Sequence, residues 1–346
     1  MEYSLDDLMK WDEKICEIAV KKYKLDFYPI EYETIDYYEM IGAMAHHGMP
    51  SMYNHWSFGK AFERTHNMYN LGMEGLPYEL IINSNPSIAY LMRENPFPLQ
   101  ILIMAHCVGH SDFFKNNRMF KNTRPENVVQ RMRAAKKRIQ SYVEDPTIGI
   151  DEVEAVIDAC HAIQFQTTKH GLRRRTQEEI RDELIEELKK AKQKEDTSLQ
   201  KKLELRLETT PLEPDYDLLG FISENAKLPN WKRDIIEILR DEGQYFWAQI
   251  QTKVANEGWA STLHYKICHD LELPSELHLP IIKSHNQVIR PHVGGINPYH
   301  LGFHMFAHIE NKRGWEECLI AREACHDGSF IRQYLDEELC HELNLF

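Results

Sequence analysis

Residues 99–116, LQILIMAHCVGHSDFFKN, predict the helix around which the chain folds. The first part of this stretch, up to Ala105, is strongly apolar, whereas Asp112 and residues 115–117 are polar. An apolar start is typical of a helix that crosses a protein core. The change to polar residues in its later turns is what we expect of a helix that leads from the core into a functional site.

Two histidines stand where this change occurs. His106 and His110 are four residues apart, so on a helix they share one face and can bind one transition-metal ion at about 2.0–2.1 Å. The spacing is that of the H-E-x-x-H zinc helix, but Cys107 replaces its general-base glutamate. Two other interpretations are a pair of hydrogen-bonded histidines without metal, and thiol catalysis by Cys107. A reactive thiolate would need a positively charged setting that the sequence does not show.

A second motif, Asn256-Glu-Gly-Trp-Ala260, contains a third candidate ligand. Glu257 has apolar neighbours that should bury it, and a buried carboxylate needs a partner charge or a metal. In one large group of zinc hydrolases, an N-E-G-x-A string on a later helix completes the metal site. His264 lies two helical turns after Glu257, on the same face. The alternative is a surface glutamate beside a glycine that lets two helices approach.

A further histidine, His161, shares a helix face with Asp158. The pair suits a set of metal ligands, or a carboxylate that orients a ligand histidine. An ordinary pair on a helix surface explains the spacing equally well.

The general base must come from another residue if a thiol replaces the glutamate, and the candidates are His264 and Glu79. Glu79 belongs to the best strand of the sequence, residues 78–84. In zinc hydrolases of this type, a strand lies beside the metal helix and can pair with an extended substrate. Loops rich in Gly, Pro and Asn often line pockets, and they suggest these substrate-binding residues: His55, Asn83, Asn85, His285 and Tyr299.

The pattern of elements predicts a mainly α (α+β) fold. We expect one large helical domain with a small β-sheet beside a zincin-like metal-binding helix. Besides the central helix, the periodicity predicts helices over 4–25, 33–47, 86–94 and, as one long element, 231–270.

A charged stretch separates two parts of this predicted core. Residues 169–208 contain twelve Lys/Arg and ten Asp/Glu with no proline or aromatic residue, which indicates a solvated helical or flexible insert. We therefore expect residues 1–168 and 211–346 to form one core around an insert at 169–210.

Composition narrows the class of protein. The formal net charge of −13 argues against binding a nucleic-acid backbone or an anionic membrane. The N-terminus lacks the basic start of a signal peptide, and no apolar run is long enough for membrane insertion. Seven scattered cysteines do not look like a secreted disulfide framework. The sequence thus predicts a cytoplasmic protein.

Six long strings follow one another along the chain: HWSFG (55–59), YELIINSNP (78–86), MAHCVGH (104–110), FFKNN (113–117), NEGWA (256–260) and GINPY (295–299). Together and in this order they resemble the stage V sporulation protein R (SpoVR) family over nearly the whole chain. The resemblance implies a cytoplasmic protein of sporulation that is associated with formation of the spore cortex. The resemblance implies a biological process but no biochemical activity, so the activity must be inferred from the residues.

The leading hypothesis is a zinc-dependent hydrolase of an amide or peptide bond in a peptide-like substrate or a peptidoglycan precursor. His106, His110 and Glu257 would bind Zn²⁺ or another divalent transition metal, with His161 or His264 as a fourth ligand or a supporting group. The alternative is a non-catalytic, metal-stabilised scaffold or regulatory protein of sporulation that recruits protein partners. A metal site without its base would fit that alternative.

Overall fold

The computed structural model describes residues 3–71, 79–166, 176–209, 212 and 216–345. The chain divides into two compact units. The first unit consists of residues 1–150 and 245–346, and the second of residues 151–244. The predicted mainly helical fold with a small sheet is confirmed, and the sheet lies in the first unit.

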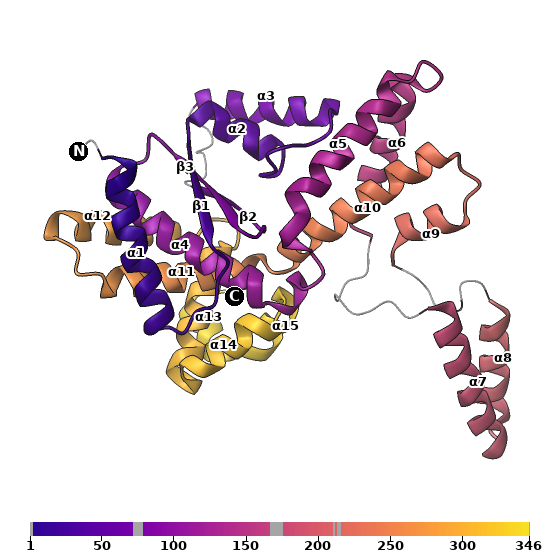
Figure 1. Cartoon of the computed structure of the whole chain (residues 1–346). Helices are drawn as coiled ribbons and strands as arrows, with labels where there is room; N and C mark the ends of the chain where they lie inside the picture. Colours follow the sequence, from indigo (N-terminus) through magenta and orange to yellow (C-terminus); the bar gives the residue numbers. More distant parts are fainter. Residues whose placement is uncertain (1–2, 72–78, 167–175, 210–211, 213–215, 346) are drawn as a thin grey trace. The chain divides into compact units, whose positions relative to one another are not determined.

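Helix α4 (Phe97–Asn116) runs through the middle of the first unit (Figure 1). It packs against α1 (Leu5–Lys21), α11 (Lys253–Asp270) and α12 (Ser275–Val288), and α11 also packs against α13 (Pro298–Arg313). All residues of α4 from Leu99 to Phe114 are buried. Polar side chains within that stretch must therefore find their partners inside the protein.

Glycines bring these helices close together. A Cβ atom on Gly109 would lie 2.7 Å from the Cα of Ala260, and one on Gly258 would lie 2.4 Å from the backbone of Gly302. Larger side chains here would push α4 or α13 away from α11. The close packing holds the two histidines of α4 next to the Asn-Glu-Gly-Trp-Ala segment of α11.

The sheet consists of β1 (Ile30–Ile35), β2 (Glu79–Ile82) and β3 (Ser87–Met92). The strand order is β1-β3-β2, with β3 parallel to β1 and antiparallel to β2. The strand predicted around Glu79 is present and lies at one side of the sheet. Its register pairs Glu79 with Leu91 of β3.

One helix prediction in this region is wrong, and another is wrong only at its start. The helix expected over 86–94 is strand β3, and the helix expected over 33–47 is present as α2 (Tyr37–Ala45) but begins later, after the end of β1. Both strands are short, and a short apolar run cannot be told from a buried helix by its periodicity. Pairing with segments far away in the chain decides the outcome.

The long helix predicted over 231–270 is two helices, α10 (Asn230–Gln251) and α11. The second begins where Asp327, the first residue of α15 (Asp327–Tyr334), accepts hydrogen bonds from the backbone N–H groups of Val254 and Ala255. These N–H groups have no partner in the first turn of a helix. A distant carboxylate therefore fixes the start of α11.

The remaining helices of the first unit are α3 (Trp56–Asn70), α5 (Val128–Glu144), α14 (Trp315–Ala324) and α16 (Glu337–Glu342), with 3₁₀ turns at Arg118–Phe120 and Pro125–Asn127. In the part of the chain that the structure describes, no helix is both long enough and apolar enough to cross a bilayer.

The second unit contains most of α6 (Gly149–Ile163) and α10, together with α7 (Gln177–Gln193), α8 (Thr197–Glu208) and α9 (Leu218–Asn225). The charged stretch is thus helical over α7 and α8. These two helices pack against each other over a small apolar cluster of their own: Ile180, Leu184, Ala191, Leu203 and Leu212.

Candidate metal centre

The two histidines of α4 lie beside a carboxylate of α11. The rings of His106 and His110 meet edge to face, with centroids 4.5 Å apart. Glu257 Oε2 lies 3.3 Å from His110 Nε2 and 3.7 Å from His106 Nε2. Three residues from two distant segments of the chain thus direct their polar atoms to one point.

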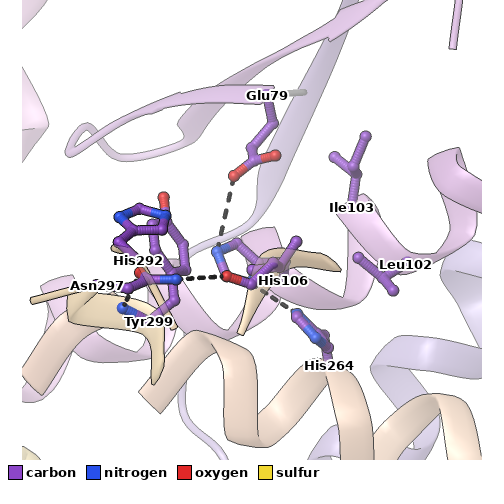
Figure 2. A pocket seen from close by; sticks show the side chains of 9 residues that line it. Glu79, Leu102, Ile103, His106, His264, His292, Asn297 and Tyr299 are labelled. Carbon is purple, nitrogen blue, oxygen red and sulfur yellow. Dashed lines mark hydrogen bonds and ion pairs between the residues drawn. The ribbon is translucent and has the colours of Figure 1, made fainter. Parts of the chain in front are cut away.

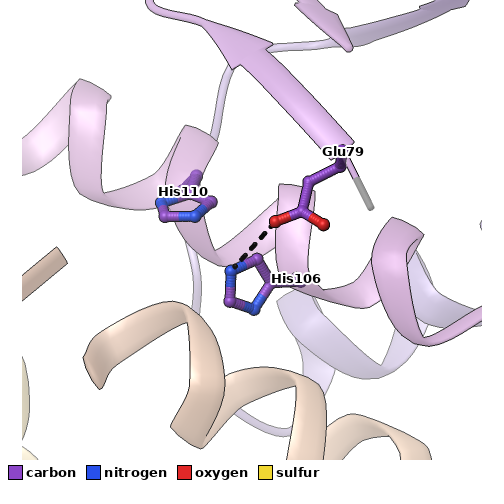
Figure 3. Close-up of side chains that lie close together, drawn as sticks. All are labelled: Glu79, His106 and His110. Atoms are coloured by element: carbon purple, nitrogen blue, oxygen red, sulfur yellow. Dashed lines mark ion pairs between the residues drawn. The ribbon is translucent and has the colours of Figure 1, made fainter. Parts of the chain in front are cut away.

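A second carboxylate reaches this point from the sheet. Glu79 Oε1 lies 3.7 Å from His106 Nε2. Figure 3 shows Glu79 extending from β2 toward the histidines of α4. One potential ligand atom from each of Glu79, His106 and His110 lies within 4.8 Å of the other two. The complete set contains two imidazoles and two carboxylates.

The chemistry of this set fits a divalent metal ion. His106 and His110 are only 3% and 5% exposed. Among the described residues, neither His106 Nε2 nor Glu257 Oε2 has a hydrogen-bond partner, although both atoms are buried. Buried polar atoms normally have partners, and a metal ion would supply one to each of these atoms. Nitrogen and carboxylate ligands suit zinc, and they also suit several other divalent metals.

Glu257 and the two histidines shift one another's pKa values. Burial by itself would raise the pKa of Glu257, but the neighbouring His110 and His106 outweigh it and hold this pKa well below its ordinary value. Burial by itself would lower the pKa of His110, but the Glu257 carboxylate dominates and raises it. The carboxylate therefore stays charged and is available to bind a positive ion.

The ring nitrogens that face away from Glu257 have their own partners. His110 Nδ1 donates to Asn256 Oδ1 at 2.9 Å, and His106 Nδ1 lies 2.8 Å from His264 Nδ1. A hydrogen bond at the second ring nitrogen is typical of metal-ligating histidines, because it orients the ring. Both histidines thus present Nε2 to the cluster.

A cavity of about 210 Å³ opens at the cluster. Glu79, His106 and His264 lie at its wall, as do Asn297 and Tyr299 (Figure 2). The ring of Tyr299 stacks on that of His106 with centroids 6.1 Å apart. Burial, assisted by the nearby Glu257 and Glu79, raises the pKa of Tyr299, so its hydroxyl keeps its proton. The cavity thus combines carboxylate, imidazole and hydroxyl groups.

Several predicted site residues belong to this arrangement. The sequence placed His106, His110 and Glu257 at a metal, and the structure brings them together with Glu79, one of the two candidate bases. His264 and Tyr299 line the cavity, and His285 contacts His264.

The structure corrects the hypothesis of thiol catalysis. Cys107 is fully buried in the apolar core of the first unit, and burial raises the pKa of its thiol. A buried thiol of this kind does not form the reactive thiolate.

Other predicted residues lie away from the cluster. Asn83, predicted to bind substrate, is fully buried and donates to Thr123 Oγ1, so we correct that role to a structural one. His55 caps the start of α3 through Ser57, and Asn85 precedes the cis-Pro86 peptide bond.

His161 lies on α6, which belongs to the second unit from Asp151 onward. Its role as a metal ligand stays a prediction.

Sequence reasoning missed two supporting residues. Asn256 was noticed only as part of its string, and its position next to Glu257 was the one signal available. Asp327, which caps α11 and so sets the turn that carries Glu257, gives no local signal at all.

Comparison with known proteins identifies the family. The family model described as "SpoVR like protein" matches residues 2–346, so the chain belongs to this family. The uncharacterized protein YcgB of Escherichia coli (strain K12) is 36% identical over an alignment of 388 positions, which covers 100% of this chain and 75% of that protein. No solved structure matches the chain.

Proposed function

We propose that this member of the SpoVR-like family is a zinc-dependent hydrolase of amide or peptide bonds. The observation that carries the proposal is the convergence of two histidines and two glutamates beside a cavity of about 210 Å³. Two histidines and one glutamate form the ligand set of one group of catalytic zinc sites, and a fourth position stays open for water or substrate.

The two carboxylates take different roles in this proposal. Glu257 lies close to both Nε2 atoms and is a metal ligand together with His106 and His110. Glu79 also lies near the two histidines, but it comes from the sheet and lines the cavity, where water and substrate would enter. It is therefore the general base, in place of the glutamate that Cys107 replaces in the helix motif.

The chain's own groups then have defined tasks. When bound, the ion supplies Lewis acidity, which lowers the pKa of water toward about 7 and polarises a carbonyl. Glu79 accepts a proton from the attacking water and passes it to the leaving amine. The Tyr299 hydroxyl donates a hydrogen bond to the oxygen that becomes negative in the transition state. His264 holds His106 in place.

The surroundings of the site support a class of substrate. Apolar Leu102, Ile103 and Val288 share the cavity wall with polar Asn297, which suits a peptide-like chain.

The name of the family points to sporulation, and a peptidoglycan precursor would suit formation of the spore cortex. All seven cysteines are free thiols, which supports a reducing cytoplasm.

Metal analysis of the purified protein tests the site. We expect one zinc ion per chain, lost in His106→Ala and Glu257→Ala. His292→Ala is the matched control, because His292 lines the same cavity but lies outside the ligand set, and it should keep the metal. No bound metal in the wild-type protein, even after incubation with Zn²⁺, would refute the site.

Hydrolysis of peptides and peptidoglycan fragments tests the reaction. Glu79→Gln should keep zinc and lose at least about 100-fold in kcat, since a general base contributes about 10²–10⁴-fold. Loss of zinc in this variant would make Glu79 a ligand instead of a base. A zinc-loaded protein without hydrolytic activity on any of these substrates would favour the scaffold.

A further inference from the structure

Three imidazole rings form a row that leads away from the metal centre. His106 Nδ1 lies 2.8 Å from His264 Nδ1, and His264 Nε2 lies 2.7 Å from His285 Nδ1. His264 is fully buried between the other two rings. His285 lines a second cavity of about 290 Å³, to which Tyr265 and His278 also contribute. The row thus connects the metal centre to another part of the first unit.

The positions of the ring protons in this row depend on one another. A histidine binds metal through an unprotonated nitrogen, so a metal at His106 Nε2 requires the proton of that ring on Nδ1. This Nδ1–H then donates to His264 Nδ1, which must be unprotonated. The proton of His264 is therefore on Nε2, from which it donates to His285 Nδ1.

From this order we infer that His285 is a positioning residue for the metal centre. In the metal-binding order it accepts the hydrogen bond from His264 Nε2, so this buried N–H has a partner and that tautomer of His264 is stabilised. That tautomer in turn selects the form of His106 whose Nε2 can bind metal. The inference rests on the proposed function, because it needs a metal ion at His106.

Without His285, the metal-binding tautomer of His264 leaves its buried Nε2–H without an acceptor, and the second tautomer is favoured. In that tautomer the proton lies on His264 Nδ1 and is directed at His106 Nδ1, which must then accept. The proton of His106 moves to Nε2 and occupies the nitrogen that would bind the metal. Part of the protein is then in a form that cannot bind the ion, and the apparent affinity falls.

The other ligand histidine shows why a second residue is needed here. His110 donates to Asn256 Oδ1, and an amide oxygen can only accept, so one contact fixes the tautomer of His110. An imidazole nitrogen can donate or accept, so the tautomer of His106 depends on His264 and on the partner that His264 Nε2 finds. The ring of His285 is held by Tyr265 and Phe303, with centroids 4.8 and 5.0 Å away.

The affinity for Zn²⁺, measured by competition with a chromophoric chelator, tests the inference. Loss of a group that supports a ligand histidine weakens metal binding about 10–100-fold, and we expect this for His285→Ala. His285→Gln should bind nearly as tightly as the wild type, because the amide oxygen can accept from His264. His278→Ala is the matched control, since His278 lines the same cavity outside the row.

The absorption spectrum of bound Co²⁺ gives an independent readout. His285→Ala should change the bands of the ion, whereas His285→Gln and His278→Ala should keep them. Unchanged zinc affinity in His285→Ala, or equal weakening in the Ala and Gln variants, would overturn the inference while the wild type still binds metal. If the wild type binds no zinc, the proposed function itself fails.

Discussion

Helix α4 and the helix pair α7–α8 differ in which side chains they bury. From Leu99 to Phe114, α4 is buried on all sides and includes Gln100, Ser111 and Asp112 as well as its two histidines. In α7 and α8, mainly the apolar side chains are buried, and the charged ones lie in water. Buried polar groups need partners from other elements, whereas solvated ones need none. The chemistry of the protein is therefore concentrated in the first region.

Asp112 provides the strongest test of this difference. Its carboxylate accepts from Trp259 Nε1 at 2.9 Å and lies 3.2 Å from Arg322 Nη1. Asp112→Ala leaves the buried Arg322 without its counter-charge, and we expect a loss of about 3–5 kcal/mol in the free energy of unfolding. Denaturant unfolding followed by tryptophan fluorescence measures the loss.

The matched control for this variant is Asp182→Ala on α7. Asp182 is exposed, so its replacement should change the free energy of unfolding by less than about 0.5 kcal/mol. A loss below about 1 kcal/mol in Asp112→Ala would contradict the importance of the buried pair.

The histidine row should give a smaller effect that depends on pH. Burial, with the nearby His106 and His304, lowers the pKa of His285 from 6.5 to about 4. Between these two values the unfolded chain binds a proton at this residue and the folded protein does not. The free energy of unfolding therefore falls as the pH falls from 6.5 to 4, by up to about 3 kcal/mol for this group.

Metal-free wild type and His285→Gln should be compared, because other groups titrate in the same range. Burial raises the pKa of Asp112 to about 6, and this group opposes the trend. His264 faces His285 from α11 and adds to the trend, since burial lowers its pKa. The wild type should lose more stability than the variant between pH 6.5 and 4. Parallel pH profiles of the two proteins would contradict the prediction.

The need of buried groups for distant partners also explains how much of the fold and the site the sequence could predict. The sequence could predict helix α4 and single out His106, His110 and Glu257, which the structure brings together, because each has a local pattern of spacing or neighbours. Strands β1 and β3 were missed because their pairing is non-local. The break before α11 was missed because the residue that caps the helix, Asp327, is far along the chain.

The hydrogen-bond partners of the histidines, and the tautomers that depend on them, are harder still to predict from sequence. The His106–His264 contact joins residues 158 positions apart, and no spacing rule reaches that far. His285 was predicted as a substrate contact from its loop-like setting, but the structure places it on α12 in contact with His264.

The smallest effect is expected on the solvated face of α8. Leu205 is 66% exposed, whereas its neighbour Leu203 is 4% exposed and belongs to the cluster between α7 and α8. Leu205→Ala should change the local stability of this pair by less than about 0.5 kcal/mol. Leu203→Ala, the matched control, should cost about 2 kcal/mol or more, because it removes buried methyl groups.

Hydrogen exchange of peptides from α7 and α8 suits this comparison, because it reports local opening that a whole-chain unfolding curve can miss. Faster exchange in Leu203→Ala with unchanged exchange in Leu205→Ala would confirm that the pair is held by its own small cluster. Equal acceleration in both variants would contradict it, because an exposed leucine stabilises a helix pair only if another surface covers it. In that case α8 would resemble α4 in being buried on more than one side.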